Sequence, residues 1–224
     1  EETCGARLTM NYMVPGGVMH DLHPNFRQRV KDFMVLYKKK IHEYDELVTG
    51  NVIFQNRMKN VGVLKPEDAI SYGCSGPTAR GSGVSCDVRK VYPYEMYDKL
   101  EFDEVLESGC DSFARYMVRI REMHQSIRII EQLIDNIPEG DFQAKTKAVL
   151  KLPKGEFYTR VETARGELGV YIVSEGGTTP YRIKFRSPGF SNLSVLDKIA
   201  RGGKIGDLIA MMGTLDLVIP DIDR

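Results

Sequence analysis

The stretch that most limits how this chain can fold is residues 73–101, which read GCSGPTARGSGVSCDVRKVYPYEMYDKLE. Four glycines and two prolines lie in it, and this density predicts that it forms neither a regular helix nor a central strand. It also carries Arg80, Asp87 and Arg89, and guanidinium groups bind carboxylates in a fixed geometry. A long irregular segment inside a compact domain is typical of a functional or interface segment. The alternative is a well-packed surface loop.

Composition restricts the class of protein. A chain of 224 residues can bury a sizeable core in one or two domains. Lys plus Arg and Asp plus Glu are 31 each, and this balance argues against nucleic acid as the main partner. The sequence contains no run of 18 apolar residues, so we expect no membrane-spanning helix. It begins EETCGARL without Met, which suggests a processed chain or an excised fragment.

Metal ligation by this chain is not expected. The four cysteines, at positions 4, 74, 86 and 110, form no CxxC motif and no Cys–His pair at zinc-site spacing. His20 and His23 lie in HDLH, where two histidines and one carboxylate can ligate iron or zinc. No third ligand follows at a useful spacing, so we favour a loop that Asp21 caps.

Apolar residues at steps of three or four predict two long helices, over residues 25–48 and 111–137. The apolar stripe of the first helix includes Phe33, Tyr44 and Ile41, and that of the second includes Ile127 and Ile130, with Arg115 and Arg119 on other faces. Shorter helices are expected over 51–60 and from Pro66 to about Tyr72, and two more over 192–213.

The period changes to that of strands after residue 156. Residues 157–162, 169–174 and 181–186 read as strands, with a hairpin turn at 175–177. The predicted fold class is therefore α+β and mainly helical, with a small antiparallel sheet in the C-terminal third. We divide the chain into a mainly helical part with the Gly/Pro/Arg loop (1–140), a small β part (141–192), and C-terminal helices with a tail (193–224).

Several motifs together resemble one known family. They are SGPxxRGSGVxxDxRKxxPYExYDxLEFD, GAR, NYxxPGGV, YMVRIREMHQSIRIIEQ, ARGELGVYIVSEGG and the ending GTxDxVxxxxDR. They are similar to the quinone-site D-type subunit of NADH-quinone oxidoreductase, respiratory complex I, which is related to the large subunit of [NiFe] hydrogenases. The resemblance covers the C-terminal portion of the family's chain. It implies a hydrogenase large-subunit-like fold, and residues 1–224 are interpreted as a single C-terminal fragment of a larger chain.

The resemblance also implies a function and its partners. Members pass electrons from an adjacent [4Fe-4S] cluster, held by a partner subunit, to quinone, and couple this to ion translocation. The implied partners are the cluster-bearing subunit, the C-type subunit and the membrane subunit at the quinone site, on the cytoplasmic face of the membrane. By position, the quinone-cavity candidates are Asp216 and Val218. The segment near the cluster holds Arg7, Thr9, Gly16 and Gly17. The structural or interface loop holds Arg80, Asp87 and Arg89.

Departures from the family pattern bear on the quinone and on the alternatives. Family members usually have a histidine where this chain has Thr9 and an arginine where it has Val14. Loss of two cations predicts a lower-potential cluster, suited to menaquinone. The linker 141–156 is shorter than is typical. GTLD stands where a hydrogenase has its second CxxC, which disfavours a hydrogenase with bound metals. A further alternative is a non-catalytic assembly module of a hydrogenase-related complex.

Overall fold

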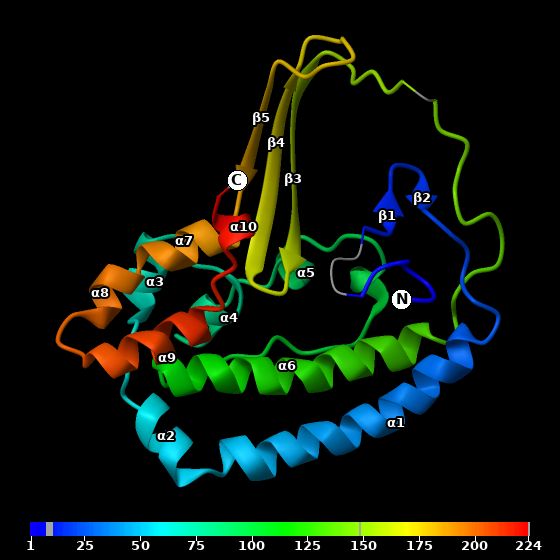
Figure 1. The fold of residues 1–224 in the computed structure, drawn as a ribbon. Coiled ribbons are helices and arrows are strands. Elements are labelled where there is room, and N and C mark those ends of the chain that lie inside the picture. Colours follow the sequence, from blue (N-terminus) through cyan, green and yellow to red (C-terminus); the bar gives the residue numbers. More distant parts are fainter. Residues whose placement is uncertain (8–10, 148, 224) are drawn as a thin grey trace.

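The structure, a computed structural model, describes residues 1–7, 11–147 and 149–223. Two long helices, α1 (Phe26–Tyr44) and α6 (Ser112–Leu133), lie side by side, and a three-stranded sheet rises on the opposite side of α6 from α1 (Figure 1). The described elements between and before them are β1 (Met13–Val14), β2 (Gly17–Val18), α2 (Val52–Met58), α3 (Pro66–Ser71), α4 (Gly76–Arg80) and α5 (Val88–Val91). After α6 come β3 (Gly155–Thr163), β4 (Gly166–Ser174), β5 (Arg182–Arg186), α7 (Pro188–Ser194), α8 (Leu196–Ala200), α9 (Ile205–Leu215) and α10 (Ile219–Ile222).

The two predicted long helices are present. α1 continues as one π-helical turn over Asp45–Thr49 and stops at Gly50, the predicted end. Asp111 caps α6: its carboxylate accepts hydrogen bonds from the backbone N–H of Ala114 and of Asn60, both at 2.8 Å. The cap therefore fixes the start of α6 and also ties it to the segment that follows α2.

Some predicted burial on these helices is wrong. Ile130 is 37% exposed, and on α1 Phe33 and Tyr44 are exposed, whereas Arg115, expected on a face other than the apolar stripe, is fully buried. The reason is that α6 packs against α1 along one side and against α4 and α9 along another. A single apolar stripe cannot describe a helix that is covered on several sides.

The Gly/Pro-rich stretch is more regular than predicted. It contains α4, α5 and a 3₁₀ turn over Tyr97–Lys99, so the expectation that it excludes a helix is wrong. Pro77 lies in the first turn of α4, where a missing N–H costs nothing, and Asp87 caps α5 by accepting from the Arg89 N–H. All of α4 is buried, so this part is no surface loop.

The sheet has the order β3–β4–β5, antiparallel throughout. Thr163 pairs with Gly166, so Ala164 and Arg165 form a two-residue turn between β3 and β4. The predicted turn at 175–177 lies in the β4–β5 connection. Because side chains alternate between the faces of a sheet, the register places these apolar residues on one face: Phe157, Val161, Leu168, Val170, Ile172, Ile183 and Phe185. We call this the apolar sheet face.

The C-terminal part holds more helices than predicted. Residues 188–222 form α7, α8, α9 and α10 rather than two short helices. The main core gathers beside them, and its buried members are Leu64, Ala69, Cys74, Ala79, Val195, Ile199, Met211 and Leu215. This core joins α3, α4, α8 and α9, and the predicted α+β class with a small antiparallel sheet is confirmed.

In the described part of the chain, no helix combines the length and the apolar character needed to cross a membrane.

Candidate functional site

Asp216 lies directly after α9 and has a left-handed backbone, with φ of 54°. Few residues other than glycine adopt this conformation, and such strain is often found at functional positions. The turn that Asp216 makes leads to Val218, which precedes α10. The two quinone-cavity candidates therefore lie at the junction of α9 and α10.

Two arginines from different elements approach the Asp216 carboxylate. Arg119 of α6 places Nη1 3.1 Å from Oδ2, and Arg165 of the β3–β4 turn places Nε 3.6 Å from the same oxygen. The Arg165 Nε also donates to the Asp216 backbone carbonyl at 3.2 Å. We call Asp216, Arg119 and Arg165 the Asp216 site. With two guanidinium groups and one carboxylate, it carries a net positive charge.

Burial lowers the pKa of Arg119 below its ordinary value. The charges of Asp216 and Glu122 raise it, and those of Arg165 and Arg80 lower it further. Among the described residues, the Nε and Nη2 of Arg119 are buried without a hydrogen-bond partner. Arg119 is thus a buried cation whose ion-pair partner in this site is Asp216.

A second group of charges surrounds Arg80, whose side chain is 1% exposed. Its Nη1 donates to Glu162 of β3 at 2.8 Å and its Nη2 to Glu122 of α6 at 2.5 Å. Beside it, Arg89 binds both oxygens of the buried Asp87 carboxylate, with Nη2 at 2.6 Å from Oδ2. We call these five residues the Arg80 cluster.

The acids of the Arg80 cluster differ in their ionisation. Burial raises the pKa of Asp87, but the hydrogen bonds and charge of Arg89, with the charge of Arg80, outweigh it and hold the pKa below its usual value. Burial raises the pKa of Glu162 above its usual value, and the Asp87 charge adds to this, although Arg80 opposes both. Two cations face three carboxylates, and the charged form is less favoured at Glu162 than at Asp87.

α6 joins the two groups. Arg119, of the Asp216 site, and Glu122, of the Arg80 cluster, are three residues apart on this helix and so lie on the same side of it. The predicted loop residues Arg80, Asp87 and Arg89 and the predicted cavity residue Asp216 are thus linked through α6. Sequence reasoning missed Arg119, Arg165, Glu122 and Glu162, because helix and strand periodicity does not indicate which polar residues meet.

The segment predicted near the cluster lies apart from these charges. Gly16 and Gly17 have φ of 96° and 151°, and a Cβ on Gly17 would be 2.3 Å from the Phe142 carbonyl oxygen. They allow the hairpin of β1 and β2 to pack closely on the linker after α6. Arg7 is exposed and pairs with Glu1 at 3.2 Å, and Thr9 lies outside the described residues. No hydrogen bond or ion pair within the described ranges joins this segment to Asp216.

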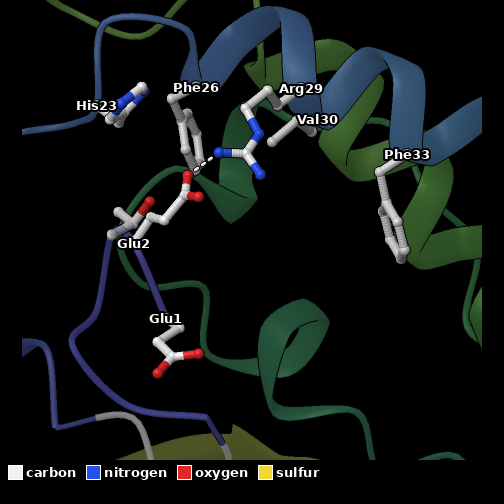
Figure 2. A pocket seen from close by; sticks show the side chains of 8 residues that line it. Glu1, Glu2, His23, Phe26, Arg29, Val30 and Phe33 are labelled. Carbon is white, nitrogen blue, oxygen red and sulfur yellow. Dashed lines mark ion pairs between the residues drawn. The ribbon is translucent and has the colours of Figure 1, made fainter.

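A cavity of about 480 Å³ lies between the first residues and α1 (Figure 2), and neither Asp216 nor Val218 lines it. Glu2 reaches Arg29 across it, and His23 and Phe26 form one end. His20 and His23 are exposed. Over residues 1–7, 11–147 and 149–223, no three His, Cys, Asp or Glu side chains gather closely enough to hold a metal ion.

The cysteines are poorly suited to binding a cluster. Burial raises the pKa of the Cys74 and Cys86 thiols to about 11 each, and metals bind the thiolate form. All four cysteines are free thiols. Within the described ranges these thiols belong to no group that could hold an iron–sulfur cluster, whereas the guanidinium donors of the Asp216 site suit a ligand with polar oxygens.

Comparison with known proteins gives a consistent result over the whole chain. The chain is 58% identical to the NADH-quinone oxidoreductase C/D subunit of Bacteroides fragilis, with all of this chain and 42% of the relative aligned. It is 46% identical to the NADH-quinone oxidoreductase D subunit of Desulforamulus reducens and 44% identical to the D 2 subunit of Solibacter usitatus, covering 61% and 60% of those chains. The chain thus spans about two-fifths to three-fifths of the length of these relatives.

A family model described as respiratory-chain NADH dehydrogenase, 49 kDa subunit, matches residues 1–151 and 144–224. Together these matches include every residue of the chain. The chain therefore belongs to the family of the 49 kDa subunit of respiratory-chain NADH dehydrogenase.

Proposed function

We propose that this chain is part of the quinone-site subunit of an NADH-quinone oxidoreductase. In this proposal a partner subunit holds a [4Fe-4S] cluster, electrons pass from it to quinone, and reduction is coupled to ion translocation. The names of the relatives and the family match support the oxidoreductase assignment. The proposed partners are the cluster-bearing subunit, the C-type subunit and the membrane subunit at the quinone site, with the protein attached peripherally at the cytoplasmic face. Menaquinone is the proposed quinone.

The observation that carries the proposal is the Asp216 site. Quinone reduction takes two electrons and two protons and places negative charge on the quinone oxygens before protons arrive. The net positive charge of Arg119, Arg165 and Asp216 favours such charge. Asp216 holds both guanidinium groups in place, so it would orient these donors rather than supply a proton.

The test is to change Asp216 to Asn and to Ala in the assembled complex. Asp216→Asn removes the charge that holds the arginines, so we expect quinone reduction to fall about tenfold or more, equivalent to about 1.4 kcal/mol. Electron input to the clusters, measured in the same preparation by their absorbance or by electron paramagnetic resonance, is expected to stay unchanged.

A matched control is Asp221→Asn. The Asp221 carboxylate accepts from the Gly189 N–H at 3.0 Å and contacts neither arginine, and an asparagine oxygen can replace that acceptor. Quinone reduction by this variant should equal that of the unchanged protein. Normal quinone reduction by both Asp216 variants would reject Asp216 as part of the site.

A second candidate function is a non-catalytic assembly module. The apolar sheet face favours it, because Phe157, Ile183 and Phe185 are 41%, 45% and 43% exposed, and exposed apolar surface commonly marks a protein contact. Under this alternative, substitutions on the apolar sheet face disturb assembly of the complex, while Asp216→Asn leaves quinone reduction unchanged.

A further inference from the structure

Both arginines at Asp216 lie close in sequence to a carboxylate that binds Arg80. Arg119 precedes Glu122 by three residues on α6, and Arg165 follows Glu162 by three residues at the end of β3. Glu122 and Glu162 are the two acceptors of the Arg80 guanidinium group. The segments that carry Arg119 and Arg165 are therefore each bound, three residues away, to the buried side chain of Arg80.

α6 and the β3–β4 turn meet through α4. α4 packs against α6 and against β4, and it does so closely at both of its ends. A Cβ on Gly76 would lie 2.5 Å from the Arg165 carbonyl oxygen, and one on Gly81 would lie 2.8 Å from the Arg115 side chain and 3.1 Å from its backbone. The direct link between α6 and the turn is weak, since Arg119 Nη1 is 3.5 Å from the Ala164 carbonyl oxygen.

Arg80 is suited to connect these elements. Its planar guanidinium group carries donors that point in fixed, different directions, so one side chain can bind two carboxylates from two elements at once. Arg80 is 1% and Glu162 4% exposed, so water competes little for the bond between them. A lysine at this position would keep the charge, but as a point charge on a flexible stem it cannot fix both carboxylates in place.

We propose that Arg80 is a positioning residue for Asp216. It holds α6 and the β3–β4 turn in the relative arrangement in which Arg119 and Arg165 face the Asp216 carboxylate from two sides. Arg80 itself touches neither Asp216 nor substrate and acts through Glu122 and Glu162. This inference rests on the proposed function only where quinone reduction is its readout.

The first experiment is a double-mutant cycle in the assembled complex, with Arg80→Lys, Asp216→Asn and the double variant. If Arg80 acts through Asp216, Arg80→Lys lowers kcat/KM for quinone about tenfold in the native background and less than about twofold when Asp216 is already Asn. Equal losses in the two backgrounds would show that Arg80 acts elsewhere and would overturn the proposal. Arg128→Lys is the control, because Arg128 also binds two carboxylates, Glu101 and Asp103, at a distant part of α6.

The second experiment measures backbone hydrogen exchange in the same complexes and does not depend on quinone. Arg80→Lys is expected to speed exchange in residues 163–167 and 214–218 and to leave residues 126–133 of α6 unchanged. Glu162→Gln removes the ion pair between Arg80 and β3. It should therefore speed exchange in residues 163–167 more strongly than Glu122→Gln does. Unchanged exchange in both segments would overturn the proposal even if activity falls.

The two readouts separate this proposal from the proposed function. If Asp216→Asn leaves quinone reduction unchanged, Asp216 is not part of the quinone site, and the exchange result alone decides whether Arg80 positions it. If Asp216→Asn lowers quinone reduction while Arg80→Lys changes neither exchange nor activity, the proposed function stands and the positioning role of Arg80 is rejected.

Discussion

Single residues in this molecule show how strongly the surroundings decide what a charge does. Asp87 and Glu162 lie in the same cluster, yet the pKa of Asp87 is lowered, because Arg89 binds both of its oxygens, while burial raises that of Glu162. Asp216 and Val218 are candidates by resemblance to a family, because the residue pattern alone does not distinguish Asp216 from the neighbouring acids Asp221 and Asp223. Arg119, the partner of Asp216, is predicted only to lie outside the apolar stripe of its helix, because a helical stripe does not reveal a salt bridge formed 97 positions further along the chain.

The ionisation of Glu162 predicts a pH dependence. The folded-state pKa of Glu162 is raised. Between the usual pKa and the raised one, the folded protein therefore binds more protons than the unfolded chain. The contribution of this group to the free energy of unfolding thus falls as pH rises through that range. Glu162→Gln removes the titration. We expect the Tm of the unchanged protein, relative to that of the variant, to fall as pH rises from 4.5 towards neutrality.

Thermal unfolding of both proteins at matched ionic strength checks this expectation. Glu104→Gln is a suitable comparison, because Glu104 accepts from the N–H groups of Cys86 and Asp87 in the same region. A Tm difference for Glu162→Gln that stays constant with pH, or that changes in the opposite direction, would contradict the raised pKa.

At the scale of elements, periodicity predicted the long helices and the three strands, and it failed at short elements. α4 is five residues long, less than two turns, so no apolar repeat can reveal it. Its signal was local: Pro77 suits the first turn of a helix, and the preceding Gly76 has φ of 62°. The glycine and proline content of residues 73–101 predicts an irregular segment, whereas the positions of those residues allow short helices.

The close packing of α4 gives a second prediction. Gly76→Ala adds a Cβ in a left-handed conformation and places it 2.5 Å from backbone atoms of the β3–β4 turn. We expect a loss of about 3 kcal/mol, from backbone strain together with steric overlap. The measurement is the free energy of unfolding from denaturant titration.

Gly73→Ala is the matched control. Gly73 has a nearly equal φ of 66°, but a Cβ there meets nothing within 4 Å, so its cost is the backbone strain alone, about 1 kcal/mol. If both variants lost the same stability, contact between α4 and the turn would not contribute.

At the scale of the whole molecule, the fold class was predictable because the helical and the strand repeats of apolar residues lie in separate parts of the sequence. The exposure of the sheet was not predictable. Alternating strands normally bury one face, yet Phe157, Ile183 and Phe185 on the apolar sheet face remain exposed. Burial depends on what packs against a face, and that information lies outside the strands themselves.

The apolar sheet face predicts how these 224 residues behave when expressed alone. Exposed apolar surface promotes self-association, so Ile183→Lys should lower the association that sedimentation velocity detects. Lys184→Gln changes the neighbouring residue on the opposite face and should leave association unchanged. Equal sedimentation of Ile183→Lys and the unchanged chain would show that another surface is responsible.

The glycine contacts of α4 also determine where the chain can accommodate additional residues. An insertion in α4 would shift Gly76 away from the β3–β4 turn or Gly81 away from Arg115, and a residue with a side chain would then occupy a contact that has room only for glycine. In the linker after α6, residues 149–154 are exposed and follow the part that packs on Gly16 and Gly17, so a few added residues there have no comparably close backbone contact to break. Relatives of this chain should therefore vary in length at the linker and keep α4 at constant length, and the linker is the place for an affinity tag or a fluorescent label.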